Sequence, residues 1–154
     1  MDYVIRPLAP EDEPVLWEMA YQGTRSTEEE DALPAHISRP PALARYVEGW
    51  GRPGDTGFIA HDGKEGKPIG AVWLRTPAVE EPAAIPELAF AVRPSHRRRG
   101  IGAALLTQWV KANPAQSSVT LAVPAKSPAV RLYERFGFKV IKESDRAVTM
   151  RREV

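Results

Sequence analysis

Apolar residues recur along this chain with two alternating periods, one typical of strands and the other typical of helices. Short apolar runs bounded by turn residues predict strands at residues 3–6, 56–62, 67–75, 85–92, 118–123, 138–143 and 146–153. The second and third runs are joined by the turn-rich "GKEG", and the last two also follow each other closely. Each of these two pairs is therefore expected to form a hairpin.

Four stretches between the strands carry apolar residues at helical spacing. The first begins in the acidic, prolyl segment "APEDEP", and the last begins at Ser127 and Pro128 and ends at Gly137. The positions that should share the apolar faces are, in chain order, Leu16, Met19 and Ala20; Leu43, Tyr46, Val47 and Trp50; Ile101, Ala104, Leu105 and Trp109; and Ala129, Leu132, Tyr133 and Phe136. Strands mixed with helices in this way predict an α/β domain.

Length and composition restrict the class of protein. The 154 residues are expected to form one domain, 1–154, with a core that needs neither metal nor disulfide. There is no cysteine, and the three histidines are far apart, so no metal site and no thiol chemistry are expected. The charged, proline-broken N-terminus does not resemble a signal peptide, and no apolar run approaches membrane-spanning length. We therefore expect a cytoplasmic protein without a membrane partner.

The stretch "RPSHRRRGIG", residues 93–102, holds four arginines although the net charge of the whole chain is only +1. It lies between a predicted strand and a predicted helix, where free N–H groups and the helix dipole attract anions. Gly100 and Gly102 would let a phosphate approach the backbone, and the arginines would add bidentate contacts. The stretch is expected to bind a phosphorylated ligand; a solvated basic turn is the alternative.

Residue spacing argues against two common phosphate sites. The dinucleotide fingerprint requires a third small residue where this chain has Leu105, and no acidic residue ends a strand about 20 residues later. A P-loop requires Gly-Lys-Ser/Thr after four spacers, which neither "GKEGKP" nor "RRRGIG" supplies. Nucleic acid is not expected as a partner. Its binding would need further basic and aromatic residues on the same face, and the sequence shows no such pattern.

Residues 97–102, Arg-Arg-Arg-Gly-Ile-Gly, match Arg/Gln-x-x-Gly-x-Gly/Ala, which is motif A of the GNAT superfamily of N-acetyltransferases. The segment "AVRLYERFGF", residues 129–138, is similar to that family's Ala-x-x-Leu-Tyr-x-x-x-Gly-Phe. The opening "VIRPLAPED" is typical of the family's first strand and helix. The chain thus resembles GNAT proteins over nearly its whole length, and least at residues 23–40.

The resemblance implies a single GNAT domain with a mixed, mostly antiparallel sheet of six or seven strands and about four helices. It further implies that the fourth and fifth strands, near residues 85–92 and 117–123, splay apart and hold acetyl-CoA. The fourth strand would pair with the pantetheine arm, and the following turn would hold the pyrophosphate. The residues that map to these contacts are Phe90, Ala91, Val92, Arg97, Arg98, Arg99, Gly100, Ile101, Gly102 and Ala103.

Lys126 departs from the family pattern, because many members have at this position an asparagine that contacts the pantetheine. An ammonium group cannot copy the paired donor and acceptor of an amide. Lys126 would therefore either contact a CoA phosphate or lie exposed at the start of a helix.

Acetyl transfer to an amine requires two proton movements. An amine with a pKa of about 10 must lose a proton before it attacks the thioester, and the departing thiolate benefits from receiving one. The resemblance implies Glu87 as the general base, directly or through water, and Tyr133 as the general acid. The N–H of Val92 would polarise the carbonyl. Glu87 as a solvent-facing residue and Tyr133 as a core aromatic are the alternatives.

The implied function is direct transfer of an acetyl group from acetyl-CoA to a primary amine of a small molecule or peptide, through a ternary complex. A non-catalytic acyl-CoA sensor with the same fold is the alternative. The acidic run 28–31 lies in the segment that usually covers the acceptor side in this family. It would attract cationic acceptors, or it only keeps an exposed arm soluble. The sequence leaves a homodimer open.

Overall fold

The computed structural model describes residues 3–22, 46–76, 85–93, 96, 100–114, 118–124, 129–145 and 147–153. The strands in these ranges are β1 (Tyr3–Pro7), β2 (Gly57–Asp62), β3 (Pro68–Arg75), β4 (Glu87–Val92), β5 (Ser118–Pro124), β6 (Lys139–Glu143) and β7 (Ala147–Glu153). The helices are the 3-10 helix η1 (Pro10–Asp12) and the α-helices α1 (Glu13–Gln22), α3 (Ile101–Ala112) and α4 (Ala129–Arg135). The described residues thus contain these three α-helices and two further helical residues, Tyr46 and Val47, against about four helices expected.

All seven strands belong to one sheet, in the order β1-β2-β3-β4-β5-β7-β6. Each neighbouring pair is antiparallel except β4 and β5, which are parallel. Both expected hairpins are present, since β2 pairs with β3 and β6 pairs with β7. The predicted fold class, a mixed and mostly antiparallel sheet flanked by helices, is confirmed.

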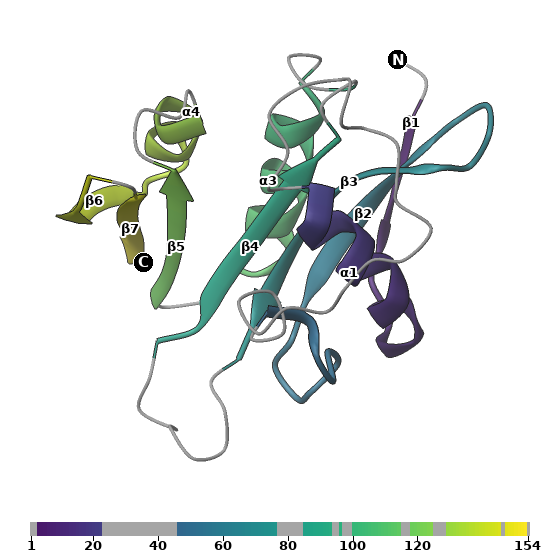
Figure 1. The fold of residues 1–154 in the computed structure, drawn as a ribbon, viewed down its shortest axis with the longest axis horizontal. Coiled ribbons are helices and arrows are strands. Elements are labelled where there is room, and N and C mark those ends of the chain that lie inside the picture. Colours follow the sequence, from purple (N-terminus) through teal and green to yellow (C-terminus); the bar gives the residue numbers. More distant parts are fainter. Residues whose placement is uncertain are drawn as a thin grey trace.

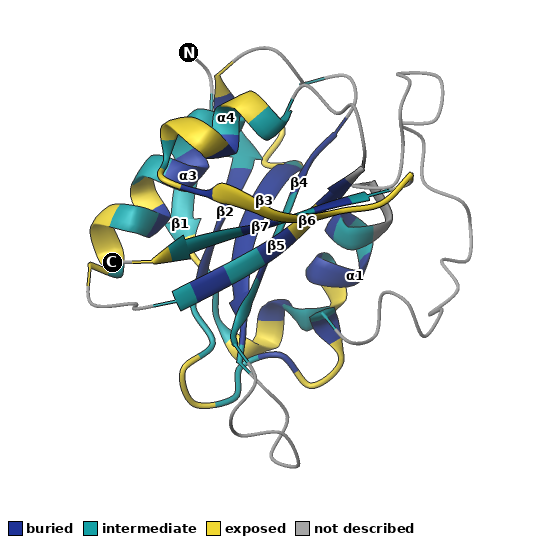
Figure 2. Ribbon diagram, turned by 90° about the vertical axis from the view of Figure 1, so that its left-hand side faces the viewer, coloured by how far each residue is buried: buried dark blue, intermediate teal, exposed yellow. Residues whose placement is uncertain are grey.

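Helix α1 covers one face of the sheet and α3 covers the other (Figure 1). The side chains of β3 alternate between two apolar clusters: Val72 and Leu74 belong to the cluster on the α3 side, and Ala71 and Trp73 to the cluster on the α1 side. Because both of its faces are covered, β3 is buried along almost its whole length, whereas the edge strand β6 is exposed throughout (Figure 2). The core therefore lies on both sides of the central strands.

Strands β4 and β5 pair at a single position, Glu87 with Thr120. The N–H of Thr120 donates to the carbonyl of Pro86 at 3.1 Å, next to this pair. From there the two strands diverge toward the end of the sheet at which α4 lies (Figure 1). The expected splaying of the fourth and fifth strands is confirmed.

Most of the expected helix faces are buried as the spacing predicted. Leu16 and Met19 are fully buried in α1, and Val47 and Trp50 are buried in the segment 46–50. In α3 the position of Ala104 is only half-buried, and Leu106 is buried instead because the apolar face extends one position further around the helix. Gly137, with φ of 92°, ends α4 as expected. No helix in the described ranges is long and apolar enough to cross a membrane.

Candidate active site

The first turn of α3 depends on glycine at position 100. Gly100 is the N-cap and has φ of 78°, a left-handed conformation that costs other residues about 1–2 kcal/mol. Its carbonyl accepts the N–H of Ala104 at 3.0 Å, and nothing lies within 4 Å of a Cβ built on it. Because glycine carries no capping side chain, this helix start can present its N–H groups to an anion.

Gly102 is required for a different reason, which is close packing against β4. A Cβ at this position would lie 2.6 Å from Cζ of Phe90. The neighbouring Ile101 is buried in the core, so the main chain is what the first turn of α3 offers a ligand there. Gly102 was expected to let a phosphate approach the backbone. The structure adds a second reason for glycine here, which is its close packing against Phe90.

Four of the predicted acetyl-CoA contacts lie outside the described residues: Arg97, Arg98, Arg99 and Lys126. The same holds for the acidic run 28–31. The described members of the set are Phe90, Ala91 and Val92 on β4 and Gly100, Ile101, Gly102 and Ala103 at the start of α3. The structure thus places two of the expected binding segments, one at the end of a strand and one at the start of the next helix.

Arg93, the first arginine of the basic stretch, points into the protein. Its side chain is 1% exposed, its Nε donates to the carbonyl of Pro68 at 2.7 Å, and its guanidinium forms an ion pair with Glu18 of α1. Its main chain joins β4 to the next loop, because its N–H donates to Ile69 and its carbonyl accepts from His96, each at 2.9 Å. Arg93 therefore anchors the strand end instead of attracting a ligand, which corrects the expectation for this arginine.

The main chain of β4 alternates between its two neighbouring strands. The N–H of Arg93 faces β3 and the carbonyl of Pro86 faces β5. By the alternation of a strand, the main-chain groups of Phe90 and Val92 face the β5 side, and those of Ala91 face β3. Phe90 and Val92 thus direct their backbone into the region where β5 has diverged. The main chain of Ala91, which was expected among the pantetheine contacts, instead faces β3, and this corrects the expectation for Ala91.

Tyr133 of α4 packs between two aromatic rings. Its ring centroid lies 5.7 Å from that of Phe90 and 5.8 Å from that of Phe138, both in edge-on geometry. The residue is 3% exposed, and burial raises the pKa of its phenol above the ordinary value, so the hydroxyl stays protonated at neutral pH. The phenol therefore carries the proton that a general acid needs, although its raised pKa makes it a weaker acid than an exposed phenol.

Glu87 of β4 is half-buried and accepts a hydrogen bond from the hydroxyl of Tyr46 at 2.6 Å. Glu87 is therefore not simply a glutamate that faces solvent, which was the alternative to a role as base. In the sequence, Tyr46 is only one position of a predicted apolar helix face, and no motif marks its pairing with a residue 41 positions away. Tyr46 is thus a site residue that only the structure reveals.

Glu87 and Tyr133 lie on opposite sides of β4. Along the strand, Leu88 and Phe90 pack with the cluster that contains Tyr133, whereas Ala89 and Ala91 pack with the cluster on the α1 side. Glu87 precedes Ala89 by two residues, and alternate residues of a strand point to the same face of the sheet. Its side chain therefore lies on the α1 face. A group held between the diverging strands could therefore be approached by a carboxylate from one face and a phenol from the other.

Comparison with known proteins agrees with this geometry. The family model for the acetyltransferase (GNAT) domain matches residues 53–140, which is more than half of the chain. No curated protein sequence matches the chain. The chain belongs to the GNAT acetyltransferase family, and it is an acyltransferase.

Several solved structures share the fold at low sequence identity. PaiA N-acetyltransferase from Thermoplasma acidophilum, in complex with coenzyme A, is 20% identical with a TM-score of 0.65, over 100% of both chains. YncA, a putative acetyltransferase from Salmonella typhimurium with its cofactor acetyl-CoA, is 16% identical with a TM-score of 0.67, over 99% of this chain and 94% of that one. Ribosomal-protein-alanine N-acetyltransferase from Brucella melitensis is 18% identical with a TM-score of 0.67, over 98% and 99%.

Proposed function

We propose that this protein transfers an acetyl group from acetyl-CoA to a primary amine, directly and within a ternary complex. The observation that carries the proposal is the divergence of β4 and β5 beside the glycine-capped start of α3. Two of the similar structures are described with coenzyme A or acetyl-CoA, which supports the same donor here. The absence of cysteine also makes direct transfer simpler than an acylated-enzyme route.

The residues around this opening fit acetyl-CoA. The main chain of Phe90 and Val92, which faces the β5 side, would pair with the pantetheine amides, with Ala91 holding the strand on β3. The open space at Gly100 and the N–H groups from there to Ala103 would receive the pyrophosphate. Contacts from Arg97, Arg98, Arg99 and Lys126 to the phosphates stay predictions of the sequence.

The bound thioester supplies an activated acetyl carbon to the amine, and the amide bond forms as the carbon–sulfur bond breaks. Glu87 takes the proton of the acceptor ammonium, directly or through a water molecule, so that the nitrogen has a free electron pair. The N–H of Val92, on the β5 side of the strand, stabilises the negative charge that develops on the carbonyl oxygen. The phenol of Tyr133 donates a proton to the departing thiolate, and the second proton, which the nitrogen loses as the amide forms, restores the phenol.

The acceptor is an amine of a small molecule or of a peptide. One similar structure is named for a ribosomal-protein alanine acceptor, which supports the peptide choice without excluding the other. Four expectations stay predictions: a single domain over 1–154, a cytoplasmic location, no nucleic-acid partner and no membrane partner. None of these is needed for the transfer step itself.

Isothermal titration with acetyl-CoA, followed by a free-thiol release screen over amines and peptides, tests the proposal. We expect stoichiometric binding and thiol release that depends on one class of amine. Binding without release for any amine would contradict the transfer, whereas no binding would contradict the donor. Desulfo-CoA is the control in the thiol assay, because it retains the nucleotide but has no thiol to release.

A further inference from the structure

Tyr46 and Glu87 form a short hydrogen bond between the segment 46–50 and strand β4. The phenol donates to Oε2 of the carboxylate at 2.6 Å, which is within the range of charge-assisted O–H to carboxylate bonds. Both residues are half-buried, so the bond is only partly exposed to competition by water. The contact therefore restricts the carboxylate of Glu87 in a way that an isolated surface glutamate would not experience.

The segment 46–50 is held on β3 by contacts that do not involve the hydroxyl of Tyr46. Three side chains take part, each bonded to a main-chain carbonyl: Trp73 Nε1 to Tyr46 at 3.0 Å, Trp50 Nε1 to Leu74 at 3.2 Å, and the Arg75 guanidinium to Glu48. All three of these donors come from buried residues. The segment would therefore stay docked without the phenol, and the main effect of the hydroxyl falls on Glu87.

The residues around Glu87 indicate what the hydroxyl of Tyr46 does. Arg75 is directly opposite Glu87 on β3, but its guanidinium is engaged with the carbonyl of Glu48 and lies 3.9 Å from the carboxylate of Asp55. Tyr46 approaches Glu87 from a third element and bonds one defined oxygen. A hydrogen bond to one defined oxygen restricts the rotamer of the Glu87 carboxylate.

We propose that Tyr46 is a positioning residue, which holds the Glu87 carboxylate aligned for the acceptor amine. This inference rests on the proposed function, because it requires Glu87 to receive the proton of the amine. Correct alignment of a base contributes to turnover without changing how acetyl-CoA binds. Tyr46 thus affects the rate through Glu87 and does not itself touch the reacting atoms.

The test is a double-mutant cycle of Tyr46→Phe and Glu87→Gln, assayed with acetyl-CoA and the amine that reacts fastest in the thiol-release screen. Tyr46→Phe keeps the ring and removes only the hydroxyl. We expect its kcat to fall by at least about ten-fold, with the KM for acetyl-CoA changed by less than about two-fold. In the Glu87→Gln background, the same substitution should have almost no further effect, because the group it positions is gone.

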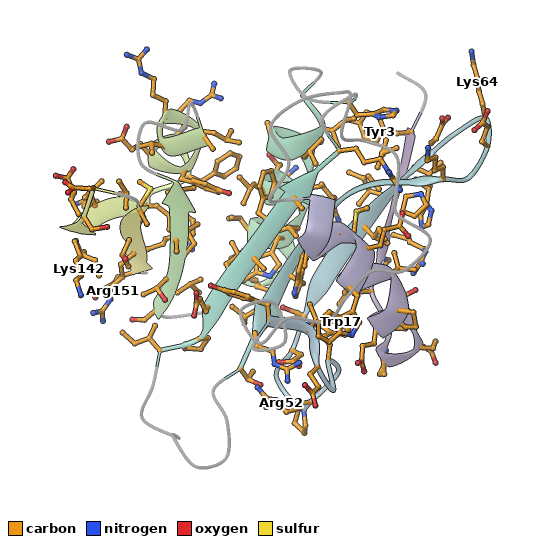
Figure 3. The ribbon with its side chains drawn as sticks, viewed as in Figure 1. Tyr3, Trp17, Arg52, Lys64, Lys142 and Arg151 are labelled. Carbon is orange, nitrogen blue, oxygen red and sulfur yellow. The ribbon has the colours of Figure 1, made fainter. Side chains whose placement is uncertain are left out.

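Tyr3→Phe is the matched control, because Tyr3 lies on β1, on the side of the molecule away from β5, β6 and α4 (Figure 3). It should leave kcat unchanged, and thermal unfolding of all variants shows that each is folded. Unchanged kcat in Tyr46→Phe, or effects of the two substitutions that multiply, would overturn the inference alone. Full activity of Glu87→Gln would overturn it together with the base role of Glu87, while acetyl-CoA binding would still support the donor.

Discussion

The ring of Phe90 occupies the space that a side chain at position 102 would need, since a Cβ on Gly102 would lie 2.6 Å from its Cζ. The same ring contacts Tyr133 at 5.7 Å between centroids. Phe90 therefore contacts both the start of α3 and Tyr133, the candidate acid on α4. A substitution at Gly102 should shift the packing of Tyr133.

Gly102→Ala is expected to displace the Phe90 ring and to lower the free energy of unfolding by about 1–3 kcal/mol, the usual cost of overpacking. It should also lower kcat, because Tyr133 packs on the displaced ring. Urea unfolding and steady-state kinetics measure the two effects. The double variant Gly102→Ala, Phe90→Leu should recover part of the lost stability, whereas strictly additive losses would mean that the two positions do not compete for space.

Gly100→Glu should abolish most of the affinity for acetyl-CoA, by at least roughly ten-fold, because it places a carboxylate where the phosphates are expected. Gly100→Ala is the matched control. Both variants carry the strain of a left-handed conformation, but alanine adds neither charge nor length. Isothermal titration compares them, and equal affinities in the two folded variants would exclude a phosphate site at this turn.

Tyr133→Phe should lower kcat by roughly 10²-fold while keeping the affinity for acetyl-CoA. The ring that packs on Phe90 and Phe138 is retained, so the fold should be kept. The comparison is made over a range of pH, with thiol release as the readout. An unaffected rate at every pH would leave Tyr133 with a packing role only.

The raised pKa of the Tyr133 phenol predicts a loss of stability in alkali. The folded state favours the protonated phenol, so its contribution is fully present below the unfolded pKa of about 10 and decreases as the pH rises above it. Urea unfolding between pH 8 and pH 11 should therefore show a steeper decline for the wild-type protein than for Tyr133→Phe. Parallel curves would mean that Tyr133 does not couple ionisation to folding.

Glu18→Gln should destabilise the protein by about 3 kcal/mol, because it removes the carboxylate that forms an ion pair with the buried Arg93 cation. Glu11→Gln is the control: it removes one acid from an exposed position in η1 and should change the free energy of unfolding by less than about 0.5 kcal/mol. Urea unfolding of both variants is the measurement. Equal stability of the two would show that the pair contributes nothing beyond a surface charge.

The sequence predicts most of the fold because its signals are local. Alternating and helical periods locate the strands and helices, and glycine marks the end of α4 at Gly137. Family motifs then imply the divergence of β4 and β5, which periodicity cannot indicate. The two hairpins and the family are thus accessible before any coordinates.

The parts that escaped prediction depend on contacts between distant residues. Nothing local distinguishes the inward-pointing Arg93 from the other arginines of its stretch, because its partner Glu18 lies 75 positions away. The pairing of Tyr46 with Glu87 is likewise a product of packing. The roles of Glu87 and Tyr133 as base and acid stay predictions, now with a defined geometry.

The single register pair between β4 and β5 makes the sheet two blocks joined at a seam, with β1 to β4 on one side and β5, β7 and β6 on the other. Few backbone hydrogen bonds cross this seam, so the smaller block should open at a lower free energy than the rest and exchange its amide hydrogens faster. A donor molecule gripped by both blocks would act as a reversible cross-link. Its arrival would couple two partly independent folding units into one cooperative body, and its departure as product would loosen them again.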